Sequence, residues 1–201
     1  MEIGLLFSTT GPYAALGSNA LDGAMMALAE IEASGGPVMA AHVRDPGGQP
    51  EAYARLTDEI LRGGRTRHVV GAITSWSRKD MIPVLERRGG LLWYPCPYEG
   101  FESSDHVVYL GACPNQHMLP LLTHLGRARP ACAFLVGSNY VWGWETLRLA
   151  RERLGAMGVA IVGERYLPLG DEDAGRLARE VAASGADVVI NSLIGPSNRA
   201  F

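Results

Sequence analysis

The chain has 201 residues, of which 47% are hydrophobic and 19% charged, and it carries a formal net charge of -3. This is the composition of an ordinary globular protein, long enough for one large domain or two small lobes. The charge gives no electrostatic reason to expect nucleic acid or an anionic membrane as a partner, and no apolar run approaches the roughly 20 residues that cross a bilayer.

Strand-like and helix-like patterns alternate through the first half of the chain. In chain order we predict a strand at 3–7, a loop at 8–18, a helix at 19–33, a strand at 38–43, a helix at 50–62, a strand at 68–73, a helix at 77–88, and strands at 91–93 and 107–110. The helix at 19–33 should pack through an apolar face made by Leu21, Ala24, Met25, Leu28 and Ile31.

The second half repeats the alternation. After Pro114 we predict helices ending near 127, 157 and 184, which alternate with strands at 131–136, 160–166 and 187–190. Such alternation is typical of βαβ units with parallel sheets. The predicted fold class is therefore α/β, with two Rossmann-like lobes: residues 1–117 form the first and residues 118–201 the second. The last residues, PSNRAF, read as the first turn of another helix, so we expect the fold to be incomplete at its C-terminus.

The stretch from residue 91 to 116 is the predicted wall of a small-molecule cleft. Its apolar strand stops abruptly at YPCPY, because two prolines remove backbone donors and force an extended path. Tyr94, Cys96 and Tyr98 follow at the carboxyl end of that strand, which is where open α/β sheets bind ligands.

Other residues could carry chemistry, but each has a structural alternative. Ser75 and Ser77 stand at a helix start, where capping is the expected role of Ser77, while capping and ligand contact both stay open for Ser75. Cys96 has no histidine nearby in sequence, so a packing or ligand-lining thiol is favoured over a nucleophile. The loop GPYAALG matches neither phosphate-binding glycine motif.

Histidines and aromatic residues mark the second half. His117 and His124 lie two helical turns apart without a third ligand, so a solvated or interlobe face is favoured over a metal site. Tyr140 and Trp142 cluster in a turn after a strand, where one aromatic ring is explained by packing and two favour the wall of a cleft.

Several motifs resemble the type I periplasmic-binding-protein fold, and within it the amide and urea branch. The runs RDPGGQPEAY, SRKDMIPVLE, LLWYPCPYEGFESS, VYLGACPNQ and GSNYVWGWE are similar to those of amide-sensing negative regulators of aliphatic amidase operons. ERYLPLG and NSLIGPSNRAF resemble the urea-binding proteins of ABC transporters equally well. The resemblance covers the whole chain, but only about the first half of such a protein.

The resemblance implies a ligand-binding site shared by the two lobes. Ser75, Tyr94 and Cys96 would line the first lobe, Tyr140 and Trp142 the second, and Ser192 with Asn191 would lie on a loop that also faces the cleft. The regulators have a threonine at the position of Cys96, and Trp142 replaces a smaller aromatic ring. The amides near Pro114, in place of an acidic group, match an uncharged amide or urea.

The resemblance also implies a function without catalysis, metal or cofactor. The expected protein is a sensor that binds a small neutral amide or urea and regulates amidase expression, with an RNA-binding antiterminator as partner. The alternative is the substrate-binding component of an ABC transporter for urea, short-chain amides or branched-chain amino acids, with a membrane permease as partner. A third class, an amidase, would need a nucleophile such as Cys96.

Localisation follows from which function is correct. The start, MEIGLLF, has no basic region followed by a long apolar run, which is the pattern of a signal peptide. If the protein is a regulator, we expect it in the cytoplasm. If it is a transporter component, we expect it to be periplasmic or extracellular after removal of a signal peptide. A chain without its return crossings is expected to fold, to bind ligand weakly and to form a homodimer through exposed sheet or helix surface.

Overall fold

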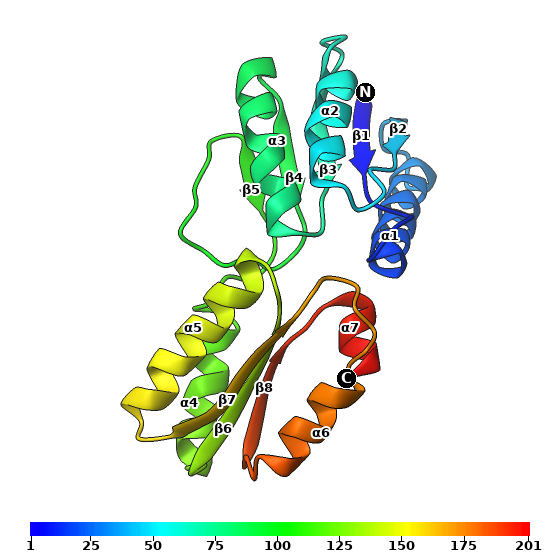
Figure 1. Ribbon diagram of the computed structural model, residues 1–201. Coiled ribbons are helices and arrows are strands. Elements are labelled where there is room, and N and C mark those ends of the chain that lie inside the picture. Colours follow the sequence, from blue (N-terminus) through cyan, green and yellow to red (C-terminus); the bar gives the residue numbers. More distant parts are fainter. The chain divides into compact units, whose positions relative to one another are not determined.

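The computed structural model describes residues 1–201 as two compact units (Figure 1). Unit 1 comprises Met1–Pro97 and Phe101–Gly111, and unit 2 comprises Tyr98–Gly100 and Ala112–Phe201. The elements of unit 1 are β1 (Glu2–Leu6), α1 (Ala14–Ala33), β2 (Ala40–Arg44), α2 (Pro50–Leu61), β3 (Thr66–Gly71), α3 (Ser75–Arg88), β4 (Leu91–Tyr94) and β5 (Val107–Tyr109). Those of unit 2 are α4 (Met118–Ala128), β6 (Cys132–Ser138), α5 (Val141–Ala156), β7 (Ala160–Leu167), α6 (Gly175–Ala183), β8 (Val188–Ser192) and α7 (Gly195–Ala200).

Each unit is built on a parallel sheet, which confirms the predicted α/β fold class. The sheet of unit 1 has the strand order β2-β1-β3-β4-β5 and that of unit 2 the order β7-β6-β8. In unit 1, β2 pairs with one edge of β1 and β3 with the other edge; in unit 2, β7 and β8 pair with the two edges of β6 in the same way. The crevice at such a switch point, outside the carboxyl ends of the strands, is where open α/β sheets hold ligands.

The core of unit 1 explains why α2 lies against the sheet. Its apolar stripe is buried as the 3.6-residue period requires, at Tyr53, Leu56, Ile60 and Leu61. Gly4 in β1 lets Ile60 approach closely, because a Cβ there would lie 2.8 Å from the Ile60 side chain. α3 packs beside α2 on the same side of the sheet (Figure 1).

Unit 2 buries both faces of its sheet, and the near-continuous apolar run of β6, CAFLV, is typical of such a central parallel strand. Ala133 and Leu135 face α4 and α5, where Leu147 and Leu154 are fully buried. Phe134 and Val136 point to the opposite face and pack against Leu177 of α6 and Leu193. Figure 1 shows this order, with α4 and α5 on one side of the sheet and α6 and α7 on the other.

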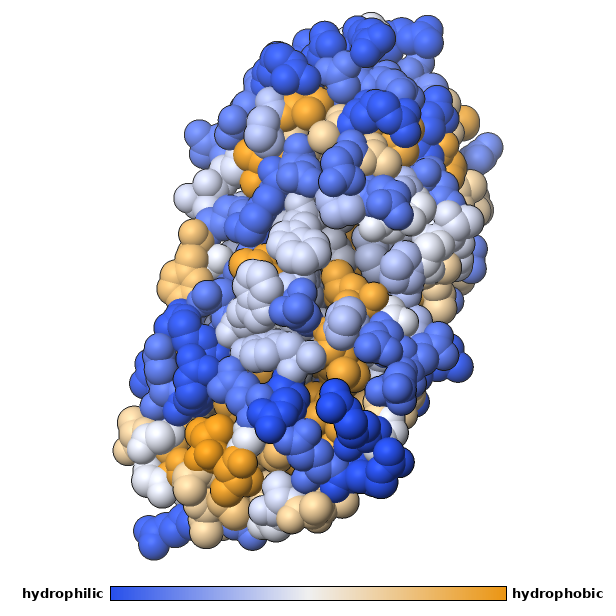
Figure 2. Space-filling view, in the orientation of Figure 1, coloured by the Kyte–Doolittle hydropathy of each residue, from blue (hydrophilic) through white to orange (hydrophobic).

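The prediction for the first helix was wrong in two respects. α1 begins at Ala14 rather than residue 19, because Gly17 brings the first turn against the loop after β1, where a Cβ would lie 1.8 Å from the Ser8 carbonyl oxygen. Its expected apolar face is also not a buried stripe: Gly17 is the only buried residue of α1, and Met25 is 44% exposed. The face drawn in Figure 2 is mostly of hydrophilic or intermediate hydropathy, with small hydrophobic patches. None of the helices combines the length and apolar character needed to cross a membrane.

Candidate ligand-binding site

The carboxyl edge of the unit 1 sheet is shaped by Ala72, directly after β3. This residue has a φ of +64° and is fully buried. A left-handed backbone is uncommon for a residue with a side chain and is found where the surrounding structure enforces it, often at functional sites. Here the Ala72 N–H donates to the Leu6 carbonyl at 3.0 Å, which locks the loop after β3 onto the end of β1.

Tyr94, the last residue of β4, is fully buried and its hydroxyl donates to the Ile73 carbonyl at 2.9 Å. This bond ties the end of β4 to the loop after β3.

Ser75 is the first residue of α3 and is 1% exposed. The N-cap is Thr74, whose Oγ1 accepts from the Ser77 N–H at 3.3 Å, so the capping alternative for Ser75 was wrong. The predicted capping role of Ser77 was also wrong, because Ser77 lies inside α3: its N–H donates to the cap, and its hydroxyl lies 2.7 Å from Thr74 Oγ1. The Ser75 Oγ instead accepts a long hydrogen bond, 3.4 Å, from Nη1 of Arg78.

Cys96 completes the first group of predicted residues. Its half-buried thiol lies 3.8 Å from the Ala72 carbonyl oxygen, to which it donates. Burial raises the pKa of the Cys96 thiol to about 11, against the smaller opposing effect of the Arg78 charge. A thiol that stays protonated near neutral pH is a poor nucleophile, which disfavours the nucleophilic alternative for Cys96.

Sequence reasoning missed the two charged residues behind this wall, Arg78 and Glu102. Arg78 has no exposed side-chain surface, and its guanidinium lies 4.8 Å from the centre of the Tyr94 ring. Its Nε donates to Glu102 at 2.6 Å. The available signal was helical spacing, since Arg78 follows Ser75 by three residues and so shares its face of α3.

Unit 2 presents aromatic side chains at the start of α5. Tyr140 is the N-cap residue and is 3% exposed, and its ring lies 6.3 Å from that of Trp142. The predicted pair is thus in contact, and both rings lie near the carboxyl end of β6. The Ser138 hydroxyl at that end accepts from the Ile194 N–H at 3.1 Å, which ties together the loops after β6 and β8.

The polar atoms of Ser192 and Asn191 are used within unit 2. The Ser192 hydroxyl donates to the Val136 carbonyl at 3.4 Å, and the residue is 3% exposed. Asn191 donates to Asn198 at 2.9 Å and accepts from the Leu193 N–H at 2.8 Å. These bonds give both residues a role in shaping the loop after β8. Similarly, the Gln116 amide oxygen accepts from the Cys113 N–H at 3.0 Å.

Trp142 and Ser192 also line a pocket of about 390 Å³ within unit 2, between α4, α5 and β8. Its walls are mainly apolar and include His117, Thr146 and all five residues of β8. Three buried polar atoms of the lining have no hydrogen-bond partner: His117 Nε2, Trp142 Nε1 and Thr146 Oγ1. Burial lowers the pKa of His117. No group of three or more His, Cys, Asp or Glu residues is placed to hold a metal ion.

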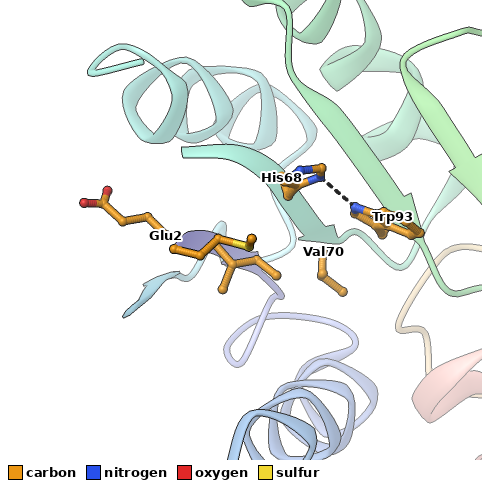
Figure 3. A pocket seen from close by; sticks show the side chains of 6 residues that line it. Glu2, His68, Val70 and Trp93 are labelled. Atoms are coloured by element: carbon orange, nitrogen blue, oxygen red, sulfur yellow. Dashed lines mark hydrogen bonds between the residues drawn. The ribbon is translucent and has the colours of Figure 1, made fainter. Parts of the chain in front are cut away.

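A second pocket, of about 250 Å³, lies on the sheet of unit 1 (Figure 3). It is lined by Met1, Glu2, Ile3, His68, Val70 and Trp93. The Trp93 indole N–H donates to His68 Nδ1 at 3.1 Å, so the main polar groups satisfy each other. None of the predicted site residues lines this pocket.

Comparison with known proteins places these features in a family. The pattern of the periplasmic binding protein domain matches residues 1–201. A solute-binding protein of an ABC transporter from R. palustris, solved in complex with 4-hydroxybenzoate, superposes with a TM-score of 0.88 at 21% identity. The match covers 100% of this chain and 56% of that one.

Two further solved structures have the same fold. The branched-chain amino acid transporter substrate-binding protein of Streptococcus pneumoniae, in complex with isoleucine, has a TM-score of 0.82 at 18% identity over 95% of this chain and 56% of that one. A substrate-binding periplasmic protein from Ralstonia solanacearum has a TM-score of 0.90 at 14% identity over 100% and 59%. The chain thus spans a little over half the length of these proteins, and it belongs to the periplasmic binding protein domain family of type I fold.

Proposed function

We propose that this chain is the ligand-binding part of a solute-binding protein of an ABC transporter, and that its ligand is a small uncharged amide or urea. The observation that carries the proposal is that Ser75 and Tyr94 both contact the Arg78 guanidinium at the carboxyl edge of the unit 1 sheet. Both side chains are buried, and their hydrogen bonds with Arg78 and Ile73 hold them in place.

We propose that the two hydroxyls offer a ligand opposite polarity. Ser75 accepts from Arg78 and would donate to a ligand carbonyl oxygen. Tyr94 donates to Ile73 and would accept from a ligand N–H. A primary amide or urea presents a carbonyl oxygen and an NH₂ group side by side, which matches this pair.

The remaining predicted residues are assigned unit by unit. We propose that Tyr140 and Trp142 form an aromatic ligand-binding surface of unit 2, and that Cys96 lines the unit 1 site without reacting. A ligand of four heavy atoms gains at most about 6 kcal/mol at about 1.5 kcal/mol per atom, or a dissociation constant of tens of micromolar. Such affinity requires nearly complete enclosure.

Transport is favoured over regulation because two of the solved structures with this fold are described as an ABC transporter solute-binding protein and a branched-chain amino acid transporter substrate-binding protein. The partner would then be a membrane permease, and the site of action would lie outside the cytoplasmic membrane. The sequence runs around residues 91–116 and 137–145 favour the second candidate, an amide-sensing regulator that restrains an antiterminator. Co-purification with one partner or the other separates the two functions.

Calorimetry tests the proposed ligand on this chain and on the longest reading frame that contains it. Acetamide, butyramide and urea should give saturable heat, whereas isoleucine and 4-hydroxybenzoate should give none. Tyr94→Phe should weaken butyramide binding at least about tenfold, because a buried ligand N–H would lose its acceptor. Tyr166→Phe in β7 is the matched control. Saturable heat from isoleucine or 4-hydroxybenzoate alone would overturn the proposal, as would turnover of acetamide that is lost in Cys96→Ser.

A further inference from the structure

Arg78 and Glu102 form a buried charge network directly behind the proposed ligand wall. Arg78 Nε lies 2.6 Å from Glu102 Oε1, and Lys79 Nζ lies 2.5 Å from Glu102 Oε2. The Tyr109 hydroxyl donates to the same carboxylate at 3.0 Å. The Arg78 and Glu102 side chains are 0% and 13% exposed, so water screens the pair poorly.

The same guanidinium contacts the wall itself. It donates to the Ser75 oxygen at 3.4 Å and lies over the rings of Tyr94 and Tyr109 at 4.8 Å and 5.9 Å. Arg78 therefore connects the carboxylate of Glu102 with two of the residues that would touch the ligand. Any change in the charge balance of the network changes the potential at the wall.

We infer that the Arg78–Glu102 pair sets the charge selectivity of the site: Arg78 orients Ser75, and Glu102 offsets the guanidinium charge so that an uncharged amide is preferred over a carboxylate of the same shape. This inference rests on the proposed function and names the residues that determine its ligand class. Arg78 acts as a positioning residue, because it reaches the ligand through Ser75.

Butyramide and butyrate form a matched pair of probes with the same shape and different charge. In Glu102→Gln the guanidinium charge is no longer offset by the carboxylate, so the ratio of butyramide to butyrate affinity should fall at least about tenfold. In the double variant Arg78→Met/Glu102→Gln both charges are absent, and the ratio should return to within about threefold of the wild-type value. An unchanged ratio in Glu102→Gln, or no recovery in the double variant, would overturn the inference.

Lys79→Met tests the same charge selectivity if Glu102→Gln fails to fold. Lys79 is 39% exposed, so Lys79→Met should fold, and the loss of one positive charge beside Glu102 should raise the butyramide to butyrate ratio about two- to threefold. A fall in that ratio would contradict the inference.

The Cys96 thiol reports the same potential without any ligand. The measurement uses a background of Cys113→Ser and Cys132→Ser, in which iodoacetamide alkylates Cys96 at pH 8. Because a positive potential favours the thiolate, alkylation should be about tenfold faster in Glu102→Gln than in the parent and slower in Arg78→Met. In the double variant the rate should be near that of the parent. Equal rates or the reverse order would overturn the inference. If the parent binds neither butyramide nor butyrate, the proposed function fails. The alkylation rates of Cys96 still decide whether Arg78 and Glu102 set the potential at the wall.

Discussion

The carboxyl edge of unit 1 and the pocket of unit 2 handle buried polar groups in opposite ways. Around Ser75 and Tyr94, hydroxyls, carbonyls and a full ion pair satisfy one another within unit 1. In the pocket beside β8, three buried polar atoms of unit 2 have no partner. Unit 1 therefore satisfies the polar groups at this edge internally, whereas the unit 2 pocket keeps buried polar atoms whose desolvation is not compensated.

The largest effect should come from breaking the ion pair of unit 1. Arg78→Met leaves the Glu102 carboxylate without its buried partner, so the free energy of unfolding should fall by about 3 kcal/mol. Urea denaturation followed by fluorescence measures this change. Arg176→Met, at an exposed position of α6, should change it by less than about 0.5 kcal/mol. Equal effects of the two substitutions would show that the pair does not organise unit 1.

A pH titration tests the same pair by another route. Burial raises the pKa of Glu102, but the hydrogen bonds from Arg78 and Lys79 outweigh it, and the folded-state pKa lies below the usual 4.5. A lowered pKa means that the contribution to stability is present above the unfolded value and is lost as the pH falls through the folded value. The difference in unfolding free energy between the parent and Glu102→Gln should therefore be constant from pH 7 to about pH 5 and shrink below pH 4. A difference that grows on acidification would contradict this assignment.

A matched pair of threonines compares the two regions directly. Thr57 of unit 1 donates to the Tyr53 carbonyl at 2.6 Å, whereas the equally buried hydroxyl of Thr146 in unit 2 has no partner. Thr57→Val should lower the unfolding free energy by about 1 kcal/mol, and Thr146→Val should leave it unchanged or raise it by up to about 1 kcal/mol. Thermal melts of both variants measure the contrast. Destabilisation of similar size by both substitutions would mean that the Thr146 hydroxyl is satisfied in solution.

Sequence periodicity was sufficient for the fold class, because strands buried on both faces and helices with apolar stripes leave clear patterns, as in β6 and α2. The start of α1 was not predictable, because it depends on the close approach of Gly17 to Ser8. The exposure of its apolar residues was not predictable either, because it depends on which part of the helix packs against the rest of unit 1. Tyr94 and Cys96 could be proposed from the abrupt end of β4. The partnership of Arg78 with Glu102 joins residues 24 positions apart, and the backbone conformation of Ala72 depends on its contact with Leu6, so neither leaves a local signal.

Nuclear magnetic resonance with ¹³C-labelled tyrosine tests the central claim most directly, because it observes the side chain that is proposed to accept from the ligand. During titration with butyramide, the Tyr94 ring resonance should shift saturably, with a dissociation constant no tighter than tens of micromolar, while the Tyr166 resonance stays in place. A Tyr94 resonance that ignores butyramide and urea, or that responds to butyrate alone, would contradict the account.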